Sequence, residues 1–233
     1  SFTIKASKLR GEPSEGMICA EDELGLGSSH AGIMLLRDDA VVGTPASEYF
    51  NIESDTILEV AITPNRSDAA SHLGVARDLA AALKHREKQH TAKPFTKPSV
   101  EGFVPFKGGD GLPIGVAIDN TEACRRYSGI TLTGLKVAES PDWLKNKLRA
   151  VGLRPINNVV DITNFVLMET GQPLHAFDAA AITGNHIHVK KLPAGTRFVT
   201  LDGVERELSA DDLMICNTRE AMCIGGVFGG AKS

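Results

Sequence analysis

The sequence has few aromatic residues, few cysteines and no long apolar run. Aromatic side chains make up 5% of the 233 residues, and the four cysteines are Cys19, Cys124, Cys216 and Cys223. Because no two of them form a CxxC pair, they match neither a zinc site nor a dense disulfide framework, and we expect reduced thiols in a cytoplasmic protein. No apolar run reaches the ~20 residues of a transmembrane helix, and the first residues lack the pattern of a signal peptide. No membrane partner is expected.

The motifs of nucleophilic hydrolases are also missing. No GxSxG, HExxH or Cys–His signature occurs, and neither a GxxxxGK[ST] phosphate loop nor a GxGxxG before a helix is present. The net charge of −4 argues against a general nucleic-acid binder, so RNA contact would need a local basic patch. Water attack on an ester remains open, in a pocket that supplies polarity and position.

The order of the predicted elements favours an α+β fold, with a small N-terminal α/β piece followed by a larger mixed α+β domain. Residues 1–50 are rich in glycine and charge and predict short strands and turns. The stretch "TILEVAIT" (56–63) alternates as a strand does, and residues 65–85 have helical periodicity with Asn65 or Ser67 as the N-cap. Polar residues, prolines and glycines make residues 86–111 a linker candidate.

Two further helices are predicted in the second half. "SPDWLKNKLRAVG" has Ser140 as its N-cap and Pro141 in its first turn. "INNVVDITNFVLMETG" is apolar on several faces, so we expect it to be buried nearly all round and to end at Gly171 in a left-handed conformation. Strand patterns fill the remainder: residues 112–119, 127–137, 186–192, a hairpin on Asp202-Gly203, 211–217 and 221–230.

Two features of the second half could carry chemistry. His175, in "GQPLHAFD", follows a helix end in a turn, where functional groups are often held, although a lone histidine beside apolar residues is more often structural. "GGVFGG" places glycines at a strand end, where a bare backbone can approach a ligand and donate N–H groups; a bulge with a tight turn is the alternative.

Two sets of charged or metal-ligating residues are weaker candidates. Lys145, Lys147, Arg149 and Arg154 form a basic cluster that fits either a solvated helix face or a nucleic-acid contact. His186 and His188 should point the same way on a strand, but no third ligand is spaced to complete a metal site, so no metal is expected.

Four stretches in this order resemble the bacterial phenylalanyl-tRNA synthetase β-subunit family over essentially the whole chain. They are "KLRGEPSEGMICAEDELGL", "ITPNRSDAASHLGVARDLAA", "LRPINNVVDITNFVLMETGQPLHAFD" and "VTLDGVERELSADDLMICN" followed by "GGVFGG". The resemblance implies a division into the tail of an OB-type tRNA-binding insertion (1–50), part of the N-terminal domain (51–95), a linker (96–111) and a B3/B4 editing domain (112–233) that is truncated at its C-terminal end.

The resemblance also implies an activity and its residues. In the family the B3/B4 domain hydrolyses tyrosine wrongly attached to tRNA(Phe), while ATP and Mg²⁺ are used on the α subunit of an α₂β₂ tetramer. Matched by motif, the editing site includes His175 and Arg154 as catalytic residues and, as substrate-binding residues, Thr163, Asn164, Gly226 and Gly229. The family's pocket uses further downstream residues, so this piece is expected to be incomplete and inactive alone, without a cofactor of its own.

Three alternatives remain at this point. The segment could be a non-catalytic scaffold that docks tRNA within the same synthetase. It could also be a free-standing esterase or metal-dependent hydrolase, or a plain nucleic-acid-binding module, which the acidic net charge disfavours. Phe165 and Val227 are guesses for the apolar walls of an editing pocket.

Overall fold

The computed structural model describes residues 4–27, 29–52, 54–86, 94–105 and 112–232. The chain divides into two compact units, Ser1–Asp55 and Thr56–Ser233. Helices, a mixed sheet and two small antiparallel pairs occur together, so the predicted α+β class is confirmed. Among the described residues, no helix combines the length and the apolar character that a membrane crossing requires.

The first unit is small and mostly irregular. It holds the antiparallel pair β1 (Ser7–Leu9) and β2 (Glu12–Ser14), the 3-10 turn η1 (Asp22–Leu24) and the single helical turn α1 (Ala46–Tyr49). A hollow in this unit is lined mainly by apolar side chains, among them Met17, Leu36 and Phe50.

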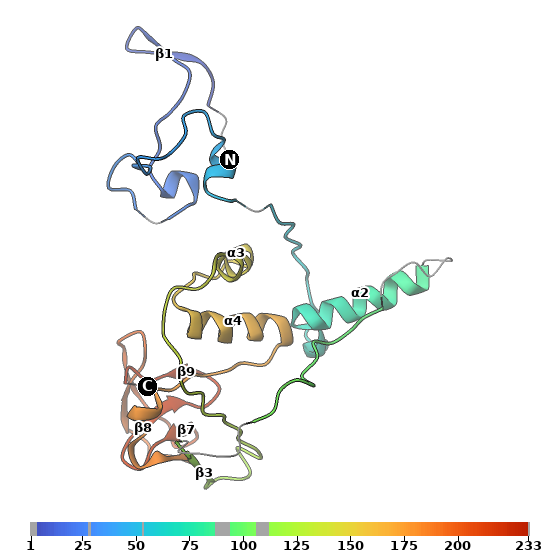
Figure 1. Cartoon of the computed structure of the whole chain (residues 1–233). Helices are drawn as coiled ribbons and strands as arrows, with labels where there is room; N and C mark the ends of the chain where they lie inside the picture. Colours follow the sequence, from blue (N-terminus) through green and yellow to red (C-terminus); the bar gives the residue numbers. More distant parts are fainter. Residues whose placement is uncertain (1–3, 28, 53, 87–93, 106–111, 233) are drawn as a thin grey trace. The chain divides into compact units, whose positions relative to one another are not determined.

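Three longer helices belong to the second unit (Figure 1). The turn η2 (Ser67–Ala69) leads into α2 (His72–Arg86), and α3 (Asp142–Ala150) precedes α4 (Asn158–Thr170). The N-terminal end of α2 meets the C-terminal end of α4, where Nδ1 of His72 lies 2.8 Å from the carbonyl oxygen of Met168. α4 ends as predicted at Gly171, with φ of 76°.

A five-stranded mixed sheet forms the rest of this unit. Its strands lie in the order β3 (Gly115–Ile118), β4 (His186–Lys191), β7 (Leu213–Cys216), β8 (Ala221–Ile224) and β9 (Phe228–Gly229). β3 and β4 are parallel, and every later pairing is antiparallel. Two 3-10 turns, η3 (Ala179–Ala181) and η4 (Thr183–Asn185), lead into β4. A separate hairpin joins β5 (Arg197–Val199) to β6 (Glu205–Glu207) through the predicted Asp202-Gly203 turn, with φ of Gly203 at 77°.

The core lies on both faces of β7, because successive side chains of a strand point to opposite faces. One cluster contains Ile182, Ile187, Val189, Ile215, Met222 and Cys223. The other contains Phe198, Leu208, Met214 and Cys216, so the β5–β6 hairpin packs its Phe198 against the sheet. The hairpin therefore shares the second of these two clusters with the sheet.

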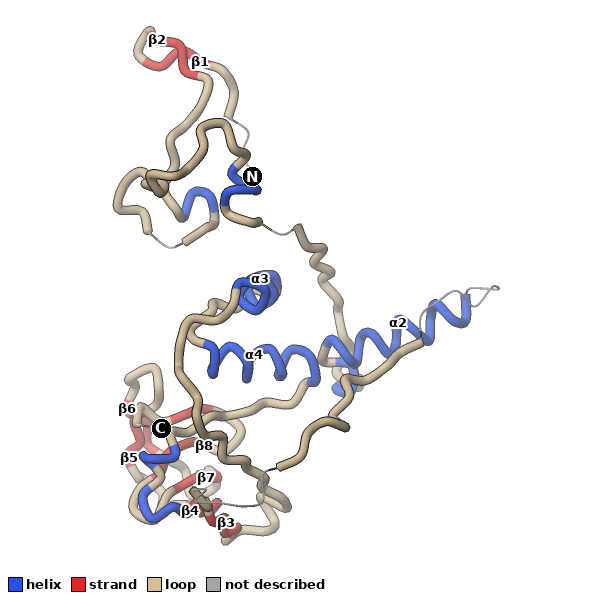
Figure 2. The backbone as a smooth tube through the Cα atoms, in the orientation of Figure 1, coloured by secondary structure: helices blue, strands red, loops and turns tan. Residues whose placement is uncertain are grey.

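Two predicted strands are wrong. Residues 56–63 and 127–137 have no strand assignment, and Figure 2 draws the chain leading up to η2 and α2 in the tan of loops and turns. Alternating apolar residues become a strand only where a neighbouring strand supplies hydrogen bonds, and neither stretch pairs with one in the described part of the chain. Ile57 and Leu58 accordingly stay 66% and 75% exposed.

The predicted burial of α4 is also wrong. Ile162 on α4 is 54% exposed, and Ile156 just before it is 67% exposed. The one fully buried α4 side chain is Asp161, which accepts hydrogen bonds from the Ser140 hydroxyl (2.5 Å) and the Ile156 N–H (2.9 Å). A polar anchor therefore joins the starts of α3 and α4.

Helix caps differ from the predicted ones. Ser140 does not cap α3, because its hydroxyl is bound to Asp161. Asn157 caps α4 by accepting from the N–H groups of Val159 and Val160 at 3.1 and 3.0 Å. At α2 the capping hydroxyl is that of Ser71, which accepts from the Gly74 N–H at 3.0 Å, rather than Asn65 or Ser67. Two parts of the predicted linker, residues 87–93 and 106–111, lie outside the described residues.

Candidate functional site

His175 lies in the loop between α4 and η3. Its ring contacts Phe177 edge to face, with centroids 4.5 Å apart. His175 is exposed, yet the protein atoms on one side of its ring remove enough water to lower its pKa below the ordinary value of 6.5. Desolvation favours the uncharged ring, so His175 is mostly neutral near pH 7 and can both donate and accept a hydrogen bond.

The ring of His175 lies directly on the main chain of Gly229. A Cβ placed on Gly229 would come within 2.6 Å of the ring's Cε1 and 2.8 Å of Leu201 Cδ1. Ordinary carbon contacts are ~3.5 Å or longer, so only a glycine fits between these two side chains. Gly229 is buried at the end of β9, and its carbonyl accepts from the Leu201 N–H at 3.0 Å. The loop that carries His175, the hairpin turn that carries Leu201 and the strand β9 that carries Gly229 therefore meet at one point, although they are far apart in sequence.

The other glycines of "GGVFGG" shape the turn between β8 and β9. Gly226 is exposed with φ of 73°, which favours glycine, and the turn is closed by the Val227 N–H and the Ile224 carbonyl at 3.0 Å. The N–H groups of Gly225 and Gly230 already donate to the carbonyls of Leu213 and Met222, both at 2.7 Å. Those two donors hold the sheet and are not available to a ligand.

Arg154, Thr163 and Asn164 are not joined to His175 by any hydrogen bond or ring contact of the described residues. Arg154 is exposed between α3 and α4, without an acidic partner in the described ranges. The Thr163 hydroxyl donates to the Val160 carbonyl of its own helix at 2.7 Å. Gly229 is thus the predicted site residue that contacts the His175 ring in the described part of the chain, and the roles of the other three stay predictions.

The guessed pocket walls, Phe165 and Val227, make no ring contact with His175 in the described part of the chain. Phe165 packs edge to face on Trp143 of α3, with centroids 5.6 Å apart. Val227 is 73% exposed in the turn before β9. Leu201 and Phe177 are the apolar side chains that contact the site. Sequence reasoning missed Leu201 because only folding brings the hairpin turn to Gly229.

The two histidines of β4 do lie together. The rings of His186 and His188 have centroids 4.7 Å apart, and Nδ1 of His188 lies 3.8 Å from a carboxylate oxygen of Asp119. The described residues contain no group of three or more side chains suited to hold a metal ion. His186 also contacts the main chain of Gly115, where a Cβ would lie 2.3 Å from its Nδ1. These contacts give the pair a packing role between β3 and β4.

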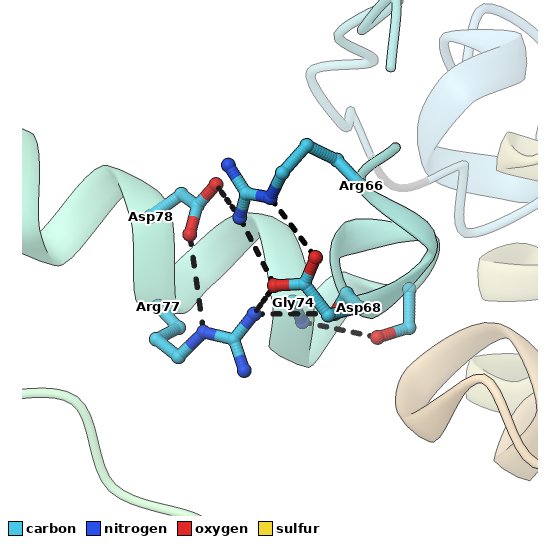
Figure 3. Close-up of polar contacts among 6 residues, drawn as sticks. Arg66, Asp68, Gly74, Arg77 and Asp78 are labelled. Atoms are coloured by element: carbon cyan, nitrogen blue, oxygen red, sulfur yellow. Dashed lines mark hydrogen bonds and ion pairs between the residues drawn. The ribbon is translucent and has the colours of Figure 1, made fainter. Parts of the chain in front are cut away.

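An ion-pair network at the start of α2 was not anticipated from the sequence (Figure 3). Arg66 bonds Asp68 at 2.9 Å and Asp78 at 2.5 Å, and Arg77 also pairs with Asp68. The bond to Arg66 is the main cause that lowers the pKa of Asp68. Gly74 lies beneath the network, where a Cβ would lie 2.5 Å from the Asp68 carbonyl oxygen. The network clamps η2 against α2 and is electrically balanced, which suits a structural role.

Residues 123–233, a little under half of the chain, match the family model described as "B3/4 domain". The matched segment contains four of the five strands of the mixed sheet (β4, β7, β8 and β9), the β5–β6 hairpin, α3, α4 and all six predicted site residues, whereas β3 lies before it.

The whole chain is also similar to a segment of proteins named phenylalanine–tRNA ligase beta subunit. It is 59% identical over 232 residues to that of Bacteroides fragilis, 60% over 232 residues to that of Bacteroides thetaiotaomicron and 48% over 237 residues to that of Salinibacter ruber. Each match covers 100% of this chain but only 28%, 28% and 27% of the relative. The resemblance predicted from the motifs is confirmed, and the chain spans little more than a quarter of these relatives.

Proposed function

We propose that this chain is part of the β subunit of a phenylalanine–tRNA ligase, and that its B3/4 region hydrolyses tyrosine wrongly attached to tRNA(Phe). The observation that carries the proposal is the His175 ring seated on the bare main chain of Gly229, inside the matched domain. In the reaction, water adds to the ester carbonyl carbon and the carbon–oxygen bond to the ribose breaks. Free tyrosine leaves, and the ribose oxygen regains a proton.

The chemical problem explains why such a site is needed. Phenylalanine and tyrosine differ by one hydroxyl, and an apolar pocket shaped for phenylalanine rejects an isostere with an added hydroxyl only weakly. A second site with polar groups aimed at that hydroxyl discriminates better, because those groups lose their partner when phenylalanine enters.

Each residue of the proposed site has a chemical task. A neutral His175 can orient a water or the 3′-terminal adenosine beside the ester carbonyl. The exposed guanidinium of Arg154, which has no acidic partner among the described residues, is suited to bind an RNA phosphate. We assign Thr163, Asn164, Gly226 and Gly229 to the amino-acid end of the substrate. The vicinal hydroxyl of the tRNA can assist the attack.

The same proposal covers the division of the chain and its partners. We assign residues 1–50 to an OB-type tRNA-binding insertion, 51–95 to the N-terminal domain, 96–111 to a linker and 112–233 to the editing domain. The partners are tRNA(Phe) and a synthetase α subunit in an α₂β₂ tetramer, where ATP and Mg²⁺ serve aminoacylation. We propose that hydrolysis in this chain uses no metal ion. We place the enzyme in the cytoplasm.

The test is hydrolysis of Tyr-tRNA(Phe) by the intact ligase. We expect His175→Ala to slow hydrolysis by about a hundredfold, the typical contribution of a positioned acid–base group. His85→Ala, an exposed histidine near the end of α2, is the matched control and should leave the rate unchanged. Equal rates for wild type and His175→Ala would remove His175 from the mechanism. Binding of tRNA without any hydrolysis would instead favour a scaffold that docks tRNA.

A further inference from the structure

Thr200 lies at the end of β5 with no exposed surface, although its side chain is polar. Its hydroxyl donates to Asp202 Oδ1 at 2.5 Å and accepts from Arg206 Nε at 3.0 Å. The Arg206 guanidinium also donates to Asp202 Oδ2 at 2.8 Å, which closes a triangle of three side chains. The buried Thr200 hydroxyl thus forms a hydrogen bond with a cation, Arg206, and with an anion, Asp202. Both would lose a hydrogen-bond partner if the hydroxyl were removed.

The main chain of the same residue holds the hairpin turn. The Gly203 N–H donates to the Thr200 carbonyl at 2.8 Å, and the Thr200 N–H donates to the Val204 carbonyl at 3.1 Å. The Val204 N–H reaches Asp202 Oδ1 at 3.2 Å. The turn is therefore held by main-chain hydrogen bonds and by side-chain hydrogen bonds, in addition to the backbone preference of Asp202-Gly203.

This turn is in direct contact with the Gly229 main chain, on which the His175 ring lies. Thr200 pairs with Gly230 in an isolated antiparallel bridge, and the next residue, Leu201, donates its N–H to the Gly229 carbonyl at 3.0 Å. Leu201 Cδ1 also lies against the same Gly229 position as the His175 ring. Any shift of the turn must move Gly229 or open the contact between Gly229 and the ring.

We propose that Thr200 is a positioning residue for this site, acting through Asp202 and Arg206 to hold the Gly229 main chain against the His175 ring. The inference rests on the hydrolytic function proposed above. No contact of the described residues joins Thr200 to His175 itself, so its influence passes through Leu201 and Gly229. If the Gly229 main chain shifts, the His175 ring can turn away from the ester, and water can enter around the ring.

The test compares Thr200→Val, Thr200→Ser and Thr196→Val in the intact ligase, with Tyr-tRNA(Phe) as substrate. Valine keeps the shape of threonine but removes both hydrogen bonds, so we expect kcat to fall about tenfold or more, since displacements near 1 Å can cost up to a hundredfold. KM should change by less than about twofold, because the residue does not touch the substrate. Serine keeps the hydroxyl and should restore kcat to within about twofold of wild type.

Thr196→Val is the matched control, because the Thr196 hydroxyl donates only to the Pro193 carbonyl (2.7 Å) in a nearby loop. It should behave as wild type. In Thr200→Val the acidic limb of the pH–rate profile should also move to higher pH, toward the ordinary histidine value, because a less desolvated ring binds a proton more readily. A purely structural role for Thr200 would lower the amount of folded enzyme without moving this limb.

Aminoacylation with phenylalanine measures how much enzyme is folded. Should Thr200→Val fail to fold, Asp202→Asn weakens the same triangle at the protein surface and should lower kcat about threefold. A wild-type kcat together with an unmoved acidic limb of the pH–rate profile, in folded Thr200→Val or Asp202→Asn, would overturn the positioning role. A Thr200→Ser enzyme as slow as Thr200→Val would overturn it as well. If His175→Ala slows hydrolysis about a hundredfold while Thr200→Val keeps the wild-type kcat, the proposed function stands and only this inference falls. A wild-type enzyme without hydrolysis refutes both.

Discussion

A single methyl group added at Gly229 tests the geometry of the site. The Cβ of Gly229→Ala would lie 2.6 Å from His175 Cε1 and 2.8 Å from Leu201 Cδ1. Because carbon atoms pack at ~3.5 Å or more, one of these side chains must retreat by about 1 Å. Gly229 does not have a positive φ, so backbone strain does not contribute and the effect is one of space alone.

We expect Gly229→Ala to slow Tyr-tRNA(Phe) hydrolysis between about tenfold and a hundredfold, the cost of misplacing a catalytic group by ~1 Å. The assay is release of labelled tyrosine by the intact ligase, with phenylalanine charging as the measure of folded enzyme. Gly129→Ala is the matched control, because a Cβ there meets no atom within 4 Å and Gly129 also lacks a positive φ. Hydrolysis by Gly229→Ala within about twofold of wild type, with an unchanged melting temperature, would refute the reasoning.

Three further predictions concern titration and stability. Desolvation lowers the pKa of His175. Hydrolysis that needs the neutral ring should therefore persist below pH 6.5 and fall only as the pH drops through the lowered pKa. A pH–rate profile with its acidic limb above pH 6.5 would contradict this. Asp161→Ala leaves the Ser140 hydroxyl without its buried acceptor and should lower the free energy of unfolding by about 1–3 kcal/mol in urea titrations, whereas exposed Asp178→Ala should cost less. Gly74→Ala should lower the free energy of unfolding by about 1–3 kcal/mol in the same titrations, because the added Cβ would lie 2.5 Å from the Asp68 carbonyl oxygen. Helix propensity alone predicts that alanine raises the stability of α2. A variant more stable than wild type would therefore show that this clash does not occur.

Local patterns were enough wherever a short stretch decides its own conformation. The C-terminal end of α4 and the hairpin turn follow from Gly171 and from Asp202-Gly203, since few residues other than glycine adopt a left-handed backbone without strain. The same logic failed for residues 56–63. Their alternation is that of a strand, but a strand also requires a neighbour, which no local pattern supplies.

By itself, the sequence determined the α+β class, the positions of most helices and strands, the resemblance to the synthetase β subunit and the choice of His175. These depend on backbone preferences, apolar periodicity and motif spacing, all of which are encoded along the chain. Only the tertiary structure decided what His175 touches. It placed the ring on Gly229, brought Leu201 to the other side and tied that turn to Thr200, while Phe165 went to Trp143 instead. Contacts between residues far apart in sequence depend on how the whole chain packs, so no stretch of sequence specifies them alone.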